Sequence, residues 1–197
     1  MSQNQPQQQL RMVWPAHLLD SPPVEKLIPG YTLQVHQPGD EAGFYRVMEL
    51  AGFHGWDDET LRPWLQRILP DGWFTLVEEA SGEIVATAMA THNPIPLHPF
   101  GGELGWVAGH PQHSGRGLGM AVCAAVVRRL LRAGYRNIYL RTDDWRLPAI
   151  RIYLKLGFAP FLFAPDMEAR WRAVCQQIDW PIPVDSRSHL KIATDEH

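Results

Sequence analysis

The sequence predicts an α/β fold in which a mixed central β-sheet is flanked by helices on both faces. Segments with the two-residue period of strands alternate along the chain with segments of helical period. A hairpin in the first half makes the sheet mixed rather than wholly parallel. With 197 residues, 45% of them apolar, the chain can bury one substantial core without disulfides.

We expect one domain between two less regular ends. Residues 1–12 are rich in glutamine and poor in apolar side chains, and four prolines punctuate residues 13–30. We therefore interpret residues 1–30 as a flexible tail and irregular lead-in, 31–180 as a single domain, and 181–197 as a polar C-terminal tail. No internal repeat or long linker divides the chain.

The domain begins with one predicted strand and two predicted helices. Tyr31–His36 alternates and is rich in β-formers, which indicates a strand. A helix follows Asp40, with apolar residues at i, i+3, i+4 and i+7: Phe44, Val47, Met48 and Ala51. Asp57 or Asp58 suits the N-cap of a second helix. The apolar stripe of that helix is Leu61, Trp64, Leu65, Ile68 and Leu69. We expect the helix to end at Pro70-Asp71-Gly72.

A hairpin and three further strand–helix pairs complete the prediction. Trp73–Glu78 and Ile84–Thr91 are strands joined by a turn at Ser81 and Gly82. The remaining elements, in order, are strand Glu103–Val107, helix Gly117–Ala133, strand Asn137–Thr142, helix Leu147–Leu156, strand Phe158–Phe163 and helix Asp166–Ile178.

Composition excludes several classes of protein. The net charge of −3 argues against a general electrostatic grip on nucleic acid. Two cysteines, Cys123 and Cys175, cannot form a disulfide-rich scaffold, and we interpret them as buried apolar residues in a reducing compartment. The sequence contains no run of 18 consecutive apolar residues, so we expect no membrane-spanning helix. The N-terminus does not resemble a secretory signal. We expect a cytoplasmic protein.

A glycine-rich turn between a strand and the longest predicted helix is the strongest functional signal. Gly115, Gly117 and Gly119 alternate with other residues where the helix starts. Glycines let the backbone approach a ligand closely, and the first amides of a helix attract anions. Arg116 adds a positive charge, and no metal is required. Considered alone, this turn is equally compatible with a tight structural connection.

Two sequence blocks make this region similar to the GNAT family of acyl-CoA-dependent N-acyltransferases. The family's phosphate loop reads Arg or Gln, any two residues, Gly, any residue, then Gly or Ala, and Ser114–Gly119 fits it except at the first position. A second family block is matched by A-I-R-I-Y-L-K-L-G-F at 149–158. The resemblance covers about residues 31–163 in element order and is specific over 103–158.

The resemblance implies the acyl-CoA N-acyltransferase (GNAT) fold, with acetyl-CoA as cosubstrate and no metal. The backbone amides of Gly115, Arg116, Gly117, Leu118 and Gly119 would bind the pyrophosphate, with Val107 on the adjoining strand. Pantetheine would lie between the ends of strands 103–107 and 137–142. Two departures stand out: Ser114 replaces the family's Arg or Gln, and Arg146 or Leu147 stands where many members carry Asn.

The resemblance also assigns proton transfer. Tyr153 occupies the position of the family's frequent general acid, which protonates the leaving sulfur. Its alternative role is a core tyrosine with a backbone partner. Glu103 lies eleven residues before Ser114, the spacing of a base that acts through water in some members, and is otherwise a strand-end carboxylate. His110 and His113 are further candidates for proton transfer, although we favour the interpretation that both are solvated loop histidines.

Candidate acceptor residues lie in two segments. Asp143 and Trp145 follow the predicted strand 137–142, at the strand end where open sheets bind ligands. Two carboxylates, Asp143 and Asp144, beside an aromatic ring can hold a cationic amine, although they could instead make an Asx turn with an N-cap for the next helix. Trp56 and the acidic run after it lie between the first two helices, a segment that often lines the acceptor site in this family.

The expected function is an N-acetyltransferase that moves an acetyl group from acetyl-CoA to a primary amine of a small molecule or protein. The amine would attack directly in a ternary complex. The alternative is a non-catalytic module of the same fold that senses acyl-CoA, which the Ser114 and Arg146 departures favour. Many members end with a strand that completes the sheet; here the helix Asp166–Ile178 could cover the sheet or meet a second copy in a homodimer.

Overall fold

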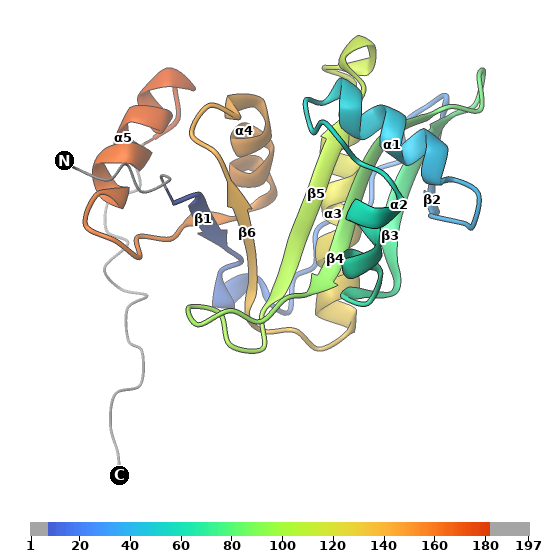
Figure 1. Cartoon of the computed structure of the whole chain (residues 1–197). Helices are drawn as coiled ribbons and strands as arrows, with labels where there is room; N and C mark the ends of the chain where they lie inside the picture. The colour runs from blue at the N-terminus through green and yellow to red at the C-terminus, as the bar shows by residue number, and fades with distance from the viewer. Residues whose placement is uncertain (1–7, 182–197) are drawn as a thin grey trace, which may run out of the picture.

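The computed structural model describes residues 8–181, so residues 1–7 and 182–197 of the two predicted tails lie outside the described part. Its seven strands form one sheet in the order β2-β3-β4-β5-β6-β1-β7 (Figure 1). Every neighbouring pair is antiparallel except β5 and β6. The strands are β1 (Leu10–Val13), β2 (Tyr31–Val35), β3 (Ile68–Glu78), β4 (Ile84–His92), β5 (Gly102–Gly109), β6 (Ile138–Thr142) and β7 (Ala159–Pro160).

Helices cover both faces of the sheet, as predicted (Figure 1). On one face, α1 and α2 enclose a core around Phe44, Trp73 and Met89. On the other face, α3, α4 and α5 bury a larger core that includes Val122 and Leu130. The helices are α1 (Glu41–Leu50), α2 (Asp58–Leu65), α3 (Leu118–Arg132), α4 (Leu147–Leu156) and α5 (Met167–Gln177), with 3-10 turns at Ala16–Leu18 and Pro111–His113.

Several predicted helix boundaries are confirmed by their local chemistry. The backbone N–H of Thr60 donates to the Asp57 carboxylate over 2.8 Å, and this hydrogen bond caps α2 and lowers the pKa of Asp57. Helix α4 has the predicted bounds and ends at Gly157, whose φ of 119° lies in the left-handed region. The apolar face of α5 is buried against the protein's own core, so this helix covers the sheet.

The predicted N-terminal lead-in is wrong at one segment that the structure places inside the sheet. Leu10–Val13 forms β1, which pairs antiparallel with β6 on one side and β7 on the other. Leu10 and Met12 are completely buried because their alternating side chains face the core. A strand from the start of the sequence thus occupies an interior position of the sheet, and residues 10–13 do not belong to a loose tail.

Two other predicted elements also need correction. Helix α2 ends at Leu65, and β3 already begins at Ile68, so the helical stripe does not continue through Leu69. Pro70-Asp71-Gly72 lies within β3 at a shift in register, where Asp71 adopts a φ of 52°. The predicted strand 158–163 shortens to the two residues of β7, because Ala159 and Pro160 alone pair in register with β1, and the next contact is a single hydrogen bond from Phe161 N–H to the Arg11 carbonyl.

The two parallel strands at the centre of the sheet diverge. Strands β5 and β6 pair only at Gly102 with Ile138 and at Glu103 with Tyr139, although both continue further. Beyond that point, β5 stays paired with β4 but its register shifts before Ala108, and Trp106 takes a φ of 52°. Such a bulge bends a strand and increases its twist. The ends of β5 and β6 therefore separate, as Figure 1 shows, and open the sheet between them.

Candidate active site

The turn from β5 into α3 presents a row of free backbone amides. Within residues 8–181, no backbone or side-chain oxygen accepts a hydrogen bond from the N–H groups of residues 115–120. These amides border a cavity of about 570 Å³, which we call the loop cavity; its lining includes Gly109, Ser114, Gly117, Pro148 and Lys155. Free amides at the start of a 15-residue helix suit an anionic ligand.

Glycine is required in this turn for two different reasons. Gly115 and Gly117 have φ angles of 78° and 86°, a conformation that side-chain-bearing residues adopt only with strain. Gly119 has a different role, because a Cβ there would come within 2.8 Å of Ile152 Cδ1 on α4. Two glycines shape the turn, and the third lets α3 pack closely against α4.

The structure places most of the predicted cofactor residues around the loop cavity. Val107, Ser114 and Leu118 line it together with the three glycines. The exception is the side chain of Arg116, which does not line the cavity and instead donates a hydrogen bond to the Tyr31 hydroxyl. The guanidinium of Arg116 therefore lies at Tyr31 and not at the loop cavity, as the sequence had led us to expect. Its backbone amide remains one of the free amides of residues 115–120.

Two histidines also border the loop cavity. His110 and His113 both line the loop cavity, with their ring centroids 5.0 Å apart. His113 Nδ1 lies 2.9 Å from the Tyr31 hydroxyl, and His110 Nδ1 accepts the backbone N–H of Gln112. The contacts fix both rings at the edge of the cavity.

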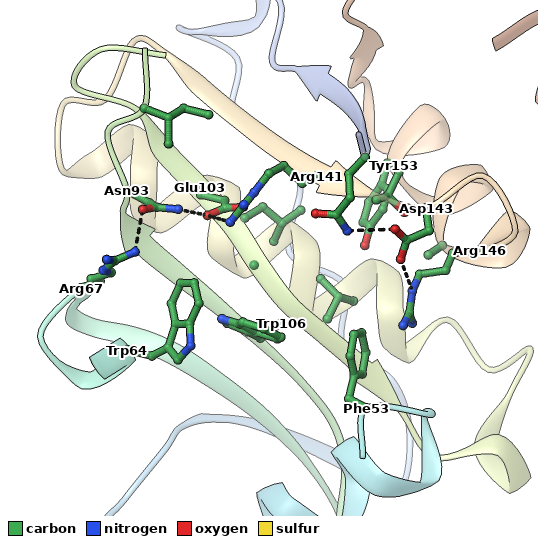
Figure 2. Close-up of a pocket in the computed structure, with 17 residues that line it drawn as sticks. Phe53, Trp64, Arg67, Asn93, Glu103, Trp106, Arg141, Asp143, Arg146 and Tyr153 are labelled. Carbon is green, nitrogen blue, oxygen red and sulfur yellow. Dashed lines mark hydrogen bonds and ion pairs between the residues drawn. The ribbon is translucent and has the colours of Figure 1, made fainter. Parts of the chain in front are cut away.

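A second cavity, of about 400 Å³, lies where β5 and β6 diverge. We call it the aromatic cavity, because Phe53, Trp64 and Trp106 form one side of it (Figure 2). Figure 2 shows a row of polar side chains on the other side, among them Glu103, Arg141 and Asp143. The two cavities share three lining residues, Val107, Arg146 and Ala149, so they meet beside the bulge of β5.

Tyr153 lines the aromatic cavity from α4, and its ring is almost completely buried. Burial raises the pKa of its phenol well above the ordinary value, and the nearby Cys123 adds to this effect. The hydroxyl is therefore protonated at neutral pH. A protonated phenol in a cavity that adjoins the loop cavity can donate a proton or a hydrogen bond to a leaving group there.

Glu103 lines the same cavity but is held on both oxygens. Arg141 Nε donates to Oε1 over 2.7 Å and Arg141 Nη2 to Oε2 over 3.2 Å. The Asn93 amide also donates to Oε2, over 2.5 Å, and its own oxygen accepts from Arg67 Nη1 over 3.0 Å. The four side chains form one connected network across the diverging strands (Figure 2).

Arg146 marks the junction of the two cavities. Its guanidinium lies 3.9 Å from the centroid of the Phe53 ring and 4.2 Å from that of Trp145, and it pairs with Asp143 at 3.2 Å. These contacts connect the loop after α1 to the start of α4. The residue that departs from the family's pattern therefore stands where the two cavities meet.

The predicted acceptor residues divide among three places. Asp143 lines the aromatic cavity, whereas Trp145 lines the loop cavity and is 68% exposed. Trp56 lines neither: it packs behind Trp106, with ring centroids 4.5 Å apart. Asp144 binds Arg170 of α5, with Nε to Oδ2 at 3.0 Å, and does not cap α4.

Sequence reasoning missed much of the aromatic cavity. The network partners Arg67, Asn93 and Arg141 lie in three separate segments that only the folded sheet brings together. Arg141 gave one signal, since it is the charged residue of the short strand β6. Gln9, just before β1, also reaches this cavity and donates to Asp143 Oδ1 over 3.0 Å.

Comparisons with known proteins agree with the fold. A model of the acetyltransferase (GNAT) family matches residues 42–158, more than half of the chain. A mycothiol acetyltransferase from Thermomonospora curvata is 31% identical over 156 residues, which cover 73% of this chain and 50% of that protein. Another, from Saccharomonospora viridis, is 36% identical over 92 residues, which cover 45% of this chain and 30% of that protein.

The fold also matches a solved structure, a GCN5-related N-acetyltransferase from Sphaerobacter thermophilus. The TM-score is 0.62 at 26% identity, with 78% of this chain and 48% of that chain covered. The chain thus spans half or less of the length of these three relatives. The resemblance inferred from the two sequence blocks is confirmed, and the chain belongs to the acetyltransferase (GNAT) family.

Proposed function

We propose that the protein transfers an acetyl group from acetyl-CoA to a primary amine by direct attack in a ternary complex. One observation carries the proposal: the free amides of residues 115–120 border a cavity that meets a second, aromatic cavity lined by a protonated tyrosine. The first cavity suits the donor and the second suits the acceptor. The similarity to proteins named acetyltransferases supports acetyl as the transferred group.

Residues of both cavities fit the donor. The amides of residues 115–120 would bind its pyrophosphate, and Lys155 supplies a further cation to the same cavity. Its thioester supplies an activated carbonyl, which would lie at the junction by Val107. The diverging strands β5 and β6 leave room there for the pantetheine arm. None of these contacts needs a metal ion.

The chain's own residues then have distinct tasks. Tyr153 protonates or hydrogen-bonds the departing sulfur, because its buried phenol keeps its proton. Glu103 takes the proton of the attacking amine through water, while Arg141 and Asn93 hold its carboxylate in place. Asp143 lies on the same side of the cavity and orients Arg146 at the junction.

The test is release of free CoA thiol from acetyl-CoA with a panel of amines, polyamines, amino acids and peptides. Thiol release that depends on an amine supports the proposal. Acetyl-CoA binding in calorimetry without turnover on any amine would favour the non-catalytic sensor instead, the role that Ser114 in the loop suggests. Absence of acetyl-CoA binding would overturn both.

We place the reaction in the cytoplasm, with which two free, buried cysteines agree. None of the helices in residues 8–181 is both long and apolar enough to span a membrane.

A further inference from the structure

The two sides of the aromatic cavity differ sharply in chemistry. Trp106 packs against Phe53 and Trp64, with ring centroids 6.0 Å and 4.8 Å apart, so the three rings form one continuous wall. None of the three is fully buried, and all line the cavity. The rings meet edge to face, with interplanar angles of 74° and 77°, so the wall offers both edges and faces and favours a flat, apolar body in the bound molecule.

The charges of the cavity favour an anion. Three arginines line it against two carboxylates, and each carboxylate already has an arginine: Glu103 binds Arg141, and Asp143 binds Arg146. A cavity for a purely cationic amine would be expected to offer an unpaired carboxylate. The third arginine, Arg67, has no carboxylate within ion-pair distance among residues 8–181.

Arg67 keeps one edge of its guanidinium free. Its Nη1 donates to Asn93, while within the described residues Nε and Nη2 donate to nothing. That edge carries two parallel N–H groups, the geometry that binds both oxygens of a carboxylate. The guanidinium also lies 5.3 Å from the Trp64 ring, which limits its movement.

The position of Arg67 also sets the shape of the ligand. Figure 2 shows Arg67 and Tyr153 well apart along the cavity, with Glu103 and Arg141 between them. The reacting amine must lie near Tyr153 and the junction of the cavities. An anion at Arg67 is then separated from the amine by the length of the aromatic wall, which excludes ligands whose amine and anion are adjacent.

We propose that the acceptor is a small amine with a flat apolar body and a carboxylate at its far end, which Arg67 binds while Trp64 and Trp106 contact the body. The inference rests on the proposed function and specifies its substrate class. It predicts that 4-(aminomethyl)benzoate is a better acceptor than benzylamine, than the neutral 4-(aminomethyl)benzamide, and than phenylglycine, in which amine and carboxylate are adjacent.

The experiment compares these four amines with the wild-type protein, Arg67→Gln and Arg62→Gln. Arg62 is an exposed arginine of α2 that does not line the cavity, so its variant controls for loss of charge in general. For Arg67→Gln we expect kcat/KM with 4-(aminomethyl)benzoate to fall about tenfold or more, mainly through KM. With benzylamine it should change less than about twofold, and Arg62→Gln should match the wild type.

Calorimetric titration of the same amines in the presence of CoA separates this inference from the proposed function. Arg67-dependent binding of 4-(aminomethyl)benzoate without thiol release supports the acceptor assignment and counts against catalysis. Thiol release with equal efficiency for the acid and for benzylamine overturns the acceptor assignment and leaves the proposed function standing. An equal loss with all amines in Arg67→Gln also overturns it, since the arginine would then serve only the Asn93 network.

Discussion

Arg141 of β6 grips Glu103 of β5 through both carboxylate oxygens, at the point where these two strands stop pairing. The Glu103 side chain is 5% exposed and that of Arg141 is 33% exposed. The contact spans the opening between the strands and continues through Asn93 to Arg67. It joins the two strands that border the aromatic cavity and holds the Glu103 carboxylate between Arg141 and Asn93.

Glu103→Gln should therefore destabilise the protein. The amide keeps the shape of the carboxylate but leaves the Arg141 guanidinium without its counter-charge, a loss of about 1–3 kcal/mol in the free energy of unfolding. Urea denaturation measures it. Glu25→Gln removes an exposed pair with Arg128 at 3.9 Å and should change stability by less than about 0.5 kcal/mol. Equal free energies of unfolding for the wild type and Glu103→Gln would show that the contact between Glu103 and Arg141 does not stabilise the fold.

Tyr153→Phe should lower kcat about 100-fold or more without weakening acetyl-CoA binding. The ring stays in place, and only the proton donor is lost. Because burial raises the pKa of this phenol above about 10, the wild-type rate should show no decline from its ionisation up to pH 10. Steady-state kinetics between pH 6 and 10 test both points. Unchanged turnover of the variant across this range would remove Tyr153 from the mechanism.

Gly117→Ala should weaken acetyl-CoA binding by about tenfold or more. A left-handed conformation costs a residue with a Cβ about 1–2 kcal/mol, and relief of that strain would rotate the amides away from the cavity. Gly82→Ala is the matched control, because Gly82 has a φ of 72° in the turn between β3 and β4, far from the loop in the sequence. Both variants should lose similar stability in urea, and only Gly117→Ala should lose affinity in calorimetry. If Gly117→Ala and the wild-type protein bound acetyl-CoA with the same affinity, the loop would have no part in binding the donor.

His98 should make the protein acid-sensitive. Burial lowers the pKa of this imidazole to about 4, whereas in the unfolded chain it is about 6.5. Between these values the unfolded state binds the extra proton, so stability falls as the pH drops from 6.5 towards 4. His98→Phe keeps a ring stacked on Tyr139 but cannot titrate, and it should flatten this decline. Urea denaturation at pH 7 and pH 4.5 measures this loss of stability in the wild type, in His98→Phe and in His17→Gln, a control at an exposed histidine. Equal losses of stability in all three proteins would refute the prediction.

The fold was largely predictable wherever a single segment carries its own pattern. The apolar period of α3, the cap of α2 and the bounds of α4 follow from neighbouring residues. The start of β3 did not, because Ile68 and Leu69 extend the helical spacing while Pro70-Asp71-Gly72 resembles a stop. In the folded sheet those three residues form an irregularity within the strand, which pairing with β4 stabilises.

The site was predictable in proportion to how local it is. The glycine loop is contiguous, so its amides and Ser114 could be named from the sequence, as could Tyr153 through the second block. The aromatic wall and the Arg67 network join the loop after α1, helix α2 and the turn that follows it, the loop after β4, and strands β5 and β6, and no spacing in the sequence encodes their proximity. Trp56 illustrates the limit: Phe53, in the same segment, lines the aromatic cavity, whereas the Trp56 ring packs against Trp106 and does not line it.

The interior place of β1 has a consequence for how the molecule matures. Leu10 is paired in register with Thr142, so β1 cannot pair until β6, more than a hundred residues later in the sequence, has been synthesised. Until then, the side chains of Leu10 and Met12 are not covered by the core, and Gln9 cannot donate its hydrogen bond to Asp143. The aromatic cavity, which Gln9 and Asp143 both line, can therefore be completed only after β1 has joined the sheet beside β6.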